Sequence, residues 1–364
     1  MENRFLKTRV EFHILQSFPV TCLNRDDLGS PKTAIVGGVQ RARISSQCWK
    51  RQVRQALQEQ GVKLAVRTKH LDTMIQNACL AKGATEEQAK KAGEMMAKSL
   101  ADNALIFVSE GEAAAYADYA AEQGFFVAGD NQKTKVNEKE LTKALTKISK
   151  AVSTRSADGL DIALFGRMVA ASPQMNIEAA ASFSHAISTH KASPEIEFFT
   201  ALDDMPTEEE QGSSHMGSLE YTSATYYRYI CLDLGQLAQT LGIEDPVALD
   251  NEMKNSVSAF IKALYIAVPS ARQSTQSGVC GWDYARILIR KGQPLQYACD
   301  TPVKTANGGG YLASSIKALD GFLSAKERMS GSLFGKIDEA VLSAEQGSID
   351  EVIAKVLKSV GLDK

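Results

Sequence analysis

Apolar and polar residues alternate from Arg9 to Gln16, and this alternation places Val10, Phe12 and Ile14 on one side of the segment. A period of two residues is typical of a strand that buries one face and leaves the other in solvent. The opposite side carries charged residues and a histidine. We therefore expect a half-buried strand near the N-terminus.

A helix is predicted over residues 46–60, after a loop at residues 17–43. Ser45 and Ser46 stand at its start. Either hydroxyl can accept a hydrogen bond from the N–H groups that the first helical turn leaves unpaired. The predicted helix therefore begins at a residue suited to cap it.

The chain from Gly61 to Val152 is rich in alanine, and its apolar residues recur at helical spacing. Thr85 with Gln88, and Asn137 with Glu140, have the spacing of a capping box, in which each side chain bonds the other residue's backbone N–H. We expect an all-helical insertion between two parts of a mixed domain.

The remaining segments alternate between strand and helix. In chain order we expect a strand at 160–164, a long irregular loop at 192–222, a strand at 225–233, a helix at 246–268, a strand at 284–290 and a mainly helical tail from Ser314. This order fits an α+β fold on a βαββαβ core, the ferredoxin-like arrangement of RRM-like modules. The mixed domain then comprises residues 1–60, 153–191 and 223–364, with the helical insertion at 61–152 and the loop at 192–222 between its parts.

The composition is that of a soluble protein, with 364 residues, 44% hydrophobic and 23% charged. No apolar run is long enough to cross a membrane, and residues 1–9 lack the apolar block of a secretory signal. The cysteines form no C-x-x-C pair, so we expect reduced cytoplasmic thiols, several of them buried, and no zinc site: Cys22, Cys48, Cys79, Cys231, Cys280 and Cys299. No cofactor motif is present, and we expect no cofactor.

Charge is unevenly distributed although the net charge is only −2. Residues 22–54 hold seven Lys or Arg and two Asp, whereas residues 203–220 hold six Asp or Glu and no Lys or Arg. This separation predicts a basic groove for phosphates and an acidic surface for another partner.

The densest basic cluster runs from Arg41 to Arg54, where the loop becomes the helix. A helix N-terminus carries unpaired N–H groups and a partial positive charge, which suit a phosphate. Lys50 and Arg54 are four residues apart and share one helix face. Phosphate binding and an ordinary capped, solvated helix both remain open from spacing alone.

Paired carboxylates at Asp26 and Asp27 can bind a divalent metal and support RNA cleavage. They can equally form turn hydrogen bonds or pair with Arg25, which we favour because no third metal ligand is evident. His185 and His190 are five apart, the wrong spacing for two ligands on one helix face, so a structural role is expected for both.

Two further segments can reach a ligand. Gly166 bends the chain after the expected strand at 160–164, which leaves Arg167 and Met168 at its end; Met168 is either a wedge between bases or a core residue. In the long loop, Phe198 is expected to anchor the loop to its own domain. Phe199 is either a second anchor or a stacking platform for a base. The glycine run 308–310 is expected to be a flexible turn.

Read in order, several of these segments resemble one family. They are Cys22–Asp27, Arg43–Gln47, Asp161–Leu164 with Gly166–Met168, Ala186–His190, Phe199–Ala201 with Asp203–Asp204, and Tyr227–Tyr229. Together they resemble the CasC backbone subunit of the type I-E CRISPR surveillance complex, Cascade, a member of the RAMP superfamily. The likeness runs from residue 8 to residue 275.

The resemblance implies a hand-shaped protein, with an RRM-like palm, a helical insertion as fingers and a long loop as thumb. Copies stack helically along the crRNA guide, and each thumb displaces one base, so that pairing with target DNA occurs in short segments. The implied partners are the guide, further copies of the chain, target DNA through the guide, and the large, small, five-prime-handle-binding and guide-processing subunits of the complex. The implied subunit is not an enzyme, and no membrane is involved.

Carried over by motif, the resemblance also implies the RNA contacts. The phosphate contacts are Arg25, Lys32, Arg43, Ser45, Gln47, Lys50 and Arg54. Arg167 is a further candidate, and the base-displacing wedge falls on Met168, Phe199 and Thr200. An acidic thumb, including Glu208–Glu210, is expected to dock on the basic surface of the next copy.

Two rival functions remain. The first is a type III-like backbone subunit that cuts target RNA with a metal ion at Asp26 or Asp27. The second is a general chaperone of single-stranded RNA outside CRISPR. A subunit that accepts any guide should contact phosphates rather than base edges, which agrees with the leading hypothesis.

Overall fold

The computed structural model describes residues 3–101, 104–126, 137–153, 159–169, 172–202 and 213–363. The strands are β1 (Thr8–Thr21), β2 (Thr33–Val36), β3 (Val39–Ile44), β4 (Val66–Thr68), β5 (Ile106–Val108), β6 (Ala181–Phe183), β7 (Ala186–Ser188), β8 (Glu195–Leu202), β9 (Ser213–Asp233), β10 (Tyr284–Lys291) and β11 (Lys336–Ser343). The helices are α1 (Ser46–Glu59), α2 (Leu71–Ala81), α3 (Glu86–Ala101), α4 (Glu110–Glu122), α5 (Glu138–Ser153), α6 (Leu160–Phe165), α7 (Leu234–Leu241), α8 (Pro246–Ile266), α9 (Gln273–Gln276), α10 (Leu312–Ser330) and α11 (Ile349–Ser359). Short 3-10 turns are η1 (Gly124–Phe126), η2 (Pro173–Met175) and η3 (Gly331–Phe334).

The main sheet has a ferredoxin-like centre. Its described strands follow the order β11-β10-β1-β9-β7-β3-β2, and β6 and β8 also pair with β9. In chain order, β1, α1, β7, β9, α8 and β10 form a βαββαβ unit, and each neighbouring pair of these strands is antiparallel. The predicted α+β fold is therefore confirmed.

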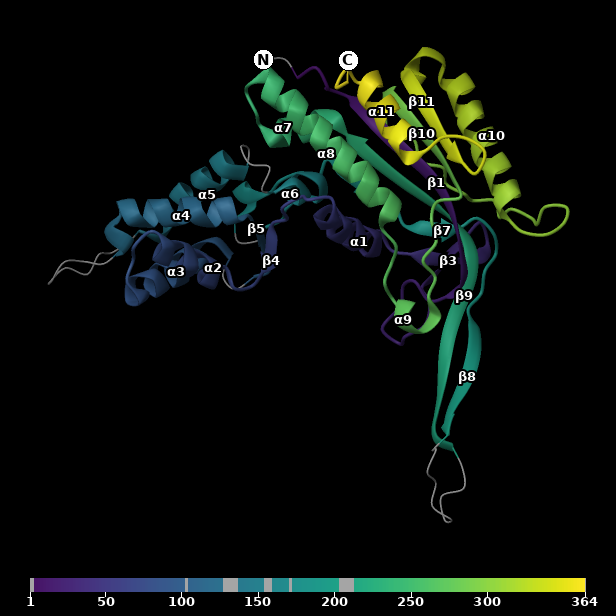
Figure 1. The fold of residues 1–364 in the computed structure, drawn as a ribbon, viewed down its shortest axis with the longest axis horizontal. Coiled ribbons are helices and arrows are strands. Elements are labelled where there is room, and N and C mark those ends of the chain that lie inside the picture. Colours follow the sequence, from purple (N-terminus) through teal and green to yellow (C-terminus); the bar gives the residue numbers. More distant parts are fainter. Residues whose placement is uncertain are drawn as a thin grey trace.

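One face of the sheet is covered by α1 and α8, which lie side by side (Figure 1). Val10, Phe12 and Ile14 of β1 point into this layer, as the alternation predicts, and each is fully buried. They pack with Val53 of α1 and Phe260 of α8 in one apolar core. This core fixes α1, with its basic residues, against the sheet.

The other face of β1 is also buried, which corrects the prediction of a half-buried strand. Glu11 and His13 have no exposed surface. Glu11 pairs with Arg290 of β10 at 2.7 Å and accepts a hydrogen bond from the backbone N–H of Leu295 at 3.0 Å. The segment after β10 thus covers the polar side of the strand, and a charge partner makes this burial tolerable.

The helical insertion has a core of its own. Apolar residues of α2, α3, α4 and α5 pack together, for example Ile75, Met96, Tyr116 and Leu145. Thr85 and Gln88 form the predicted capping box at the start of α3, and Asn137 accepts a hydrogen bond from the backbone N–H of Lys139 rather than that of Glu140. In Figure 1 this helical unit extends from one side of the sheet domain. Two short strands, β4 and β5, also belong to this part of the chain.

The segment predicted as a strand at 160–164 is the helix α6, so that prediction is wrong. A short apolar run does not distinguish a strand from a buried helix. Here the fully buried carboxylate of Asp161 accepts hydrogen bonds from the Arg54 side chain at 2.6 Å and from the Ala65 backbone N–H at 3.0 Å. These contacts hold the helix between α1 and the insertion.

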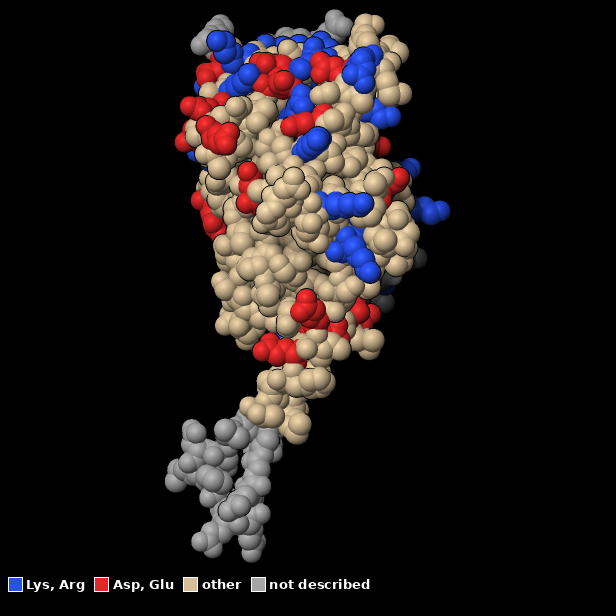
Figure 2. Space-filling view, turned by 90° about the vertical axis from the view of Figure 1, so that its right-hand side faces the viewer, with Lys and Arg blue, Asp and Glu red and all other residues tan. Residues whose placement is uncertain are grey.

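The segment predicted as an irregular loop at 192–222 is largely a β-hairpin. Its described strands, β8 and the first part of β9, pair from Glu195–Tyr221 to Leu202–Ser213. Gly217 does not break the strand, because the Phe199 ring lies over it: a Cβ there would be 2.5 Å from a ring carbon. The hairpin projects well beyond the body (Figures 1 and 2).

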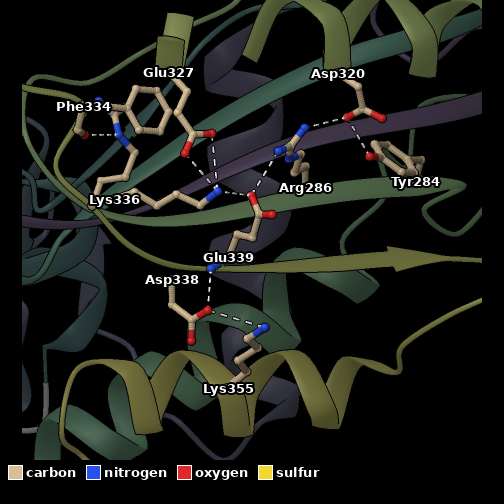
Figure 3. A network of polar contacts seen from close by, with 10 residues as sticks. Tyr284, Arg286, Asp320, Glu327, Phe334, Lys336, Asp338, Glu339 and Lys355 are labelled. Atoms are coloured by element: carbon tan, nitrogen blue, oxygen red, sulfur yellow. Dashed lines mark hydrogen bonds and ion pairs between the residues drawn. The ribbon is translucent and has the colours of Figure 1, made fainter. Parts of the chain in front are cut away.

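The C-terminal part adds a strand that the mainly helical prediction missed. β11 pairs with β10, and charged side chains tie it to its surroundings (Figure 3). Arg286 of β10 bonds Asp320 of α10 at 3.2 Å and Glu339 of β11 at 3.0 Å. Lys336 joins Glu339 as well, at 3.0 Å. This network links α10, β10 and β11 in one unit.

Candidate nucleic-acid interface

The N-terminus of α1 is the centre of the candidate site. Ser45 caps the helix as predicted, and its hydroxyl accepts a hydrogen bond from the Cys48 N–H at 3.2 Å. The backbone N–H of Ser45 donates to the side chain of Asn24 at 2.9 Å. This second bond brings the loop after β1 onto the helix start, so two segments that are far apart in sequence form one surface.

A hollow of about 710 Å³ lies between this loop, the helix start and the segment before α9. Of the predicted phosphate contacts, Arg25, Ser45 and Gln47 line it. The others do not: Lys32, Arg43, Lys50 and Arg54. Arg51 and Ser270 line it as well. The hollow is wide and polar, which suits an extended strand better than a small apolar ligand.

Charges of both signs lie at the hollow: Asp26 and Asp27 line it together with Arg25 and Arg51. The pKa values of two cysteines show which cations lie near it. Burial raises the pKa of Cys22. Arg25 and Arg272 oppose this shift, whereas Glu220 and Asp26 add to it. Burial likewise raises the pKa of Cys48, opposed by Lys32 and Arg51. Each guanidinium or ammonium group is therefore near enough to stabilise a negative charge in this region.

Arg43 lies at the same helix end. Its guanidinium is 3.5 Å from Nδ1 of His185, which also accepts a hydrogen bond from the Ser46 N–H at 3.2 Å. Burial, Arg43 and Lys32 lower the pKa of His185. The neutral imidazole of His185 thus accepts a hydrogen bond from the first turn of α1. This contact agrees with the structural role expected for this histidine.

Lys50 and Arg54 do not share one environment, although they share a helix face. The Lys50 ammonium lies 5.9 Å from the Phe183 ring centre, and burial lowers its pKa. Arg54 is bound inside the chain, to Asp161 and to the carbonyl oxygen of Ala65. These bonds give Arg54 a structural role, and its phosphate contact stays a prediction.

Two other arginines that the sequence analysis singled out, Arg41 and Arg167, are buried. Arg41, at the start of the basic cluster, is fully buried and donates to the carbonyl oxygens of Ser188, Cys299 and Asp300. Arg167 is 4% exposed, and its guanidinium pairs with Glu112 at 2.7 Å. The expectation that Arg167 reaches a ligand is wrong, because its side chain turns into the protein.

Met168, in contrast, is 79% exposed, so it is not a core residue. It follows α6 rather than a strand. Gly166 bends the chain there with a φ of +79°, and a Cβ at this position would lie 2.9 Å from the carbonyl oxygen of Ile177. An apolar side chain at the surface remains available to contact a base.

The hairpin presents its aromatic residues on opposite faces. Phe199 lies over Gly217, while Thr200 shares the other face with Phe198. Phe198 is 78% exposed, so the expectation that it anchors the loop to its own domain is wrong. Ile196 and Met216 are exposed on this same face.

Acidic side chains gather where the hairpin leaves the body (Figure 2). Of the acidic run predicted at 203–220, Glu220 belongs to the described part of β9. The residues Asp203, Asp204 and Glu208–Glu210 lie outside the described residues.

The remaining candidates of the sequence have ordinary structural roles. The Asp26 carboxylate accepts hydrogen bonds from the N–H groups of Leu28 and Ser30, both at 2.9 Å, which is the turn role favoured above. His190 stacks on Tyr311 at 3.6 Å. The glycine run 308–310 forms an exposed turn. All six cysteines are free thiols.

Within the described ranges, no group of three or more His, Cys, Asp or Glu side chains is arranged to hold a metal ion. No helix in those ranges has the length and apolar character needed to cross a membrane.

Sequence reasoning missed several residues at the hollow, among them Asn24, Arg272 and Ser270. Asn24 lies in the Cys22–Asp27 motif, but its hydrogen bond to Ser45 cannot be predicted from residue spacing. The other two come from a segment more than two hundred residues away, and no local signal connects them to the helix.

Fold and site together define a class: an RRM-like domain with a helical insertion, a projecting hairpin and a basic helix N-terminus. The chain belongs to the CT1975-like protein family, whose sequence profile matches residues 10–360. The match covers both the palm-like sheet domain and the insertion.

Solved structures with a similar fold are also found. The chain is similar to a subunit of a pre-nicking CRISPR RNA-guided surveillance complex, with 25% identity and a TM-score of 0.76 over 95% of this chain and 99% of that one. It also shares its fold with a chain of another CRISPR RNA-guided surveillance complex, with 22% identity and a TM-score of 0.59 over 96% and 99% of the two chains. Comparison with curated proteins finds no match.

Proposed function

We propose that this protein is a non-catalytic backbone subunit of a type I-E CRISPR surveillance complex, Cascade. Copies of it assemble helically along the crRNA guide in the cytoplasm. Each copy binds the phosphate backbone without sequence preference and presents the bases for pairing with target DNA in antiviral defence. The large, small, handle-binding and guide-processing subunits are its other protein partners.

The observation that carries the proposal is the hollow at the N-terminus of α1. Arg25, Gln47 and Arg51 line it beside Asp26 and Asp27. Lys32 and Arg272 add positive charge nearby, and the Asp26 carboxylate is bound to backbone N–H groups of its own turn. Cationic side chains, amides and helix N–H groups bind phosphate oxygens and carry no information about the base. A surface of this kind accepts any guide sequence.

Base displacement is the second part of the proposal. It is supported by the exposed Met168 and by the hairpin that carries Phe198, Phe199 and Thr200. Apolar and aromatic side chains unstack or stack on bases of any identity. A hairpin that projects from the body can cross a bound strand.

The phosphate site is tested with the variant Arg25→Ala in the assembled complex. Arg25 is exposed and lines the hollow, so its loss should weaken binding equally for guides of unrelated sequence. The slope of log binding constant against log salt should fall by ~0.7 for one lost phosphate contact. Binding is measured at several salt concentrations.

Lys254→Ala is the matched control. It removes the same charge from the partly exposed pair with Asp363, on the helix α8. Its salt slope should equal that of the unchanged protein. An unchanged slope in Arg25→Ala would contradict the proposal, as would an assembly that purifies without guide RNA.

The absence of catalysis is tested with magnesium and a complementary RNA. The proposal requires that the assembly leave the RNA intact. Cleavage that disappears in Asp26→Asn or Asp27→Asn, with the guide still bound, would instead establish a type III-like nuclease. Asparagine preserves turn formation at these positions, so loss of cleavage could not be assigned to a broken loop.

A further inference from the structure

Met168 stands out from its neighbours in the chain. It is 79% exposed, whereas Arg167 and Val169 are 4% and 3% exposed. Its apolar side chain thus points into solvent between two side chains that point into the protein. The contacts of Arg167 explain how this is achieved.

The Arg167 guanidinium is held from three directions. One terminal nitrogen donates to both carboxylate oxygens of Glu112, at 2.7 and 2.9 Å, and to the carbonyl oxygen of Phe107 at 3.2 Å. The other donates to the Ser149 hydroxyl at 2.9 Å, and Nε donates to the carbonyl oxygen of Met175 at 3.1 Å. A planar guanidinium with this many partners has one orientation.

Glu112 is itself fixed within the helical insertion. It is fully buried and closes the capping box of α4 by accepting from the Ser109 N–H at 3.0 Å. The Ser149 hydroxyl of α5 donates to the same carboxylate at 2.5 Å. The ion pair therefore joins Arg167 to two helices of the insertion at once.

The backbone on both sides of Met168 is equally constrained. Arg167 and Ile177 exchange N–H···O bonds of 3.0 and 2.9 Å, and the Val169 N–H donates to the Asn176 side chain at 2.7 Å. Gly166 has no room for a Cβ against Ile177. Met168 is thus the tip of a short segment that is fastened at each end.

The same contacts lead toward α1. The carbonyl oxygen of Phe107 accepts a hydrogen bond from Arg167. The guanidinium carbon of Arg54 lies 5.0 Å from the centre of the Phe107 ring. Arg54 in turn bonds Asp161 of α6. A continuous set of contacts therefore connects the helix of the phosphate site with the segment that bears Met168.

We propose that Arg167 is a positioning residue, through whose buried pair with Glu112 the helical insertion holds Met168 at the surface as the base-displacing tip. The inference rests on the proposed function, because it assumes that Met168 acts on a guide base. It assigns to the insertion a part in shaping the bound guide, although its core lies apart from the hollow at α1.

The test probes guide bases chemically with dimethyl sulfate in the assembled complex. Displaced bases should react at regular intervals, and Met168→Ala should abolish or shift this pattern. The double variant Arg167→Met with Glu112→Met replaces a buried ion pair by apolar side chains of similar length, an exchange that usually preserves folding. It should retain the guide and lose the regular reactivity to the extent that Met168→Ala does.

Adding Met168→Ala to the double variant should then cause no further change, because both act on the same tip. Retention of the regular pattern in the double variant would overturn the inference, as would additive effects. Should the double variant fail to fold, Ser149→Ala, which removes the hydroxyl shared by Glu112 and Arg167, must alter reactivity at the bases that Met168→Ala affects.

Failure of the proposed function gives a different result. If Met168→Ala leaves the reactivity pattern unchanged, or if the unaltered assembly has no regular pattern, the displacement role itself is wrong. If Met168→Ala changes the pattern and neither Arg167→Met with Glu112→Met nor Ser149→Ala does so, only the positioning role is wrong.

Discussion

His13 lies on the side of β1 that sequence alternation assigned to solvent. Its Nδ1 is 3.0 Å from the Tyr227 hydroxyl, and its Nε2 has no hydrogen-bond partner. Burial, with Arg290 and Arg286 nearby, lowers the pKa of His13 from 6.5 to about 3. Its 4.0 Å approach to Glu11 is therefore not a salt bridge, because the imidazole is neutral.

This shift predicts a specific acid sensitivity. The unfolded chain binds a proton on His13 near pH 6.5 and the folded chain near pH 3, so stability falls as pH drops between these values. At pH 5 the loss from this one residue is about 2 kcal/mol relative to pH 7.5. His13→Gln should remove it, as measured by denaturant unfolding at both pH values.

His70→Gln is the control for that experiment, because His70 is exposed. It should keep the full acid sensitivity of the unaltered protein. Glu11 is present in both variants, and its raised pKa, caused by burial, acts in the opposite direction. Equal sensitivity in His13→Gln and the unaltered protein would contradict the assignment.

For single residues, the sequence predicts roles that depend on near neighbours better than roles that depend on distant partners. Ser45 was expected to cap α1, and it does, because capping depends on neighbours within one turn. Arg167 was expected at the surface and is buried, because its partner Glu112 is fifty-five residues earlier. Asn24 lies in the Cys22–Asp27 motif, but its bond to Ser45 was not predicted for the same reason: the bond closes across a folded loop.

Among the elements, the C-terminal unit depends on charge pairs of unequal burial. The Arg286 side chain is 13% exposed and joins α10 to β11 through Asp320 and Glu339 (Figure 3). The Lys355–Asp338 pair is 47% and 38% exposed. Solvent screens the second pair more, because Lys355 is much more exposed than Arg286 while the carboxylates are similarly exposed.

We expect Arg286→Met to lower the free energy of unfolding by about 2 kcal/mol, because it leaves two carboxylates without their shared partner. Lys355→Met should change it by less than about 1 kcal/mol. Urea unfolding measures both. Equal losses in the two variants would show that burial does not set the strength of these pairs.

Long periodic elements were predicted well and short or paired ones poorly. The expected helix at 246–268 is α8 (Pro246–Ile266), because its apolar positions repeat over many turns. The segment at 160–164 is too short for its hydrophobic period to distinguish a strand from a helix. The hairpin was mistaken for a loop because β8 is stabilised by pairing with β9, and Gly217 is favourable only beneath the Phe199 ring.

On the scale of the molecule, the hairpin exposes apolar surface that is not buried against the body. Ile196, Phe198 and Met216 share one face and are 59%, 78% and 71% exposed. Phe198→Ser should change unfolding stability by less than about 0.5 kcal/mol. It should nevertheless reduce assembly on the guide, measured by mass photometry with guide RNA.

Val247→Ser is the matched control, since Val247 is 68% exposed on α8. It should assemble normally. A similar loss of assembly in both variants would indicate a general effect of exposed apolar residues rather than a role of the hairpin.

The general plan of the molecule follows from the sequence, but its arrangement in space does not. Alanine-rich periodicity at residues 61–152 indicated a helical unit, and the alternation at 9–16 indicated the sheet. Nothing in either pattern shows that Val169 and Met175, far along the chain, complete the core of the insertion. Such contacts depend on where α6 ends, and the residues of α6 were predicted to form a strand.

The length of β9 has a mechanical consequence. This strand runs unbroken from Ser213 in the hairpin to Asp233. It pairs with β8 in the hairpin, and in the body with β7 and β6 on one edge and β1 on the other. A pull on the hairpin along the strand loads many backbone hydrogen bonds at once, in shear, instead of opening them one by one. The projection therefore behaves as a stiff lever rooted in the centre of the sheet.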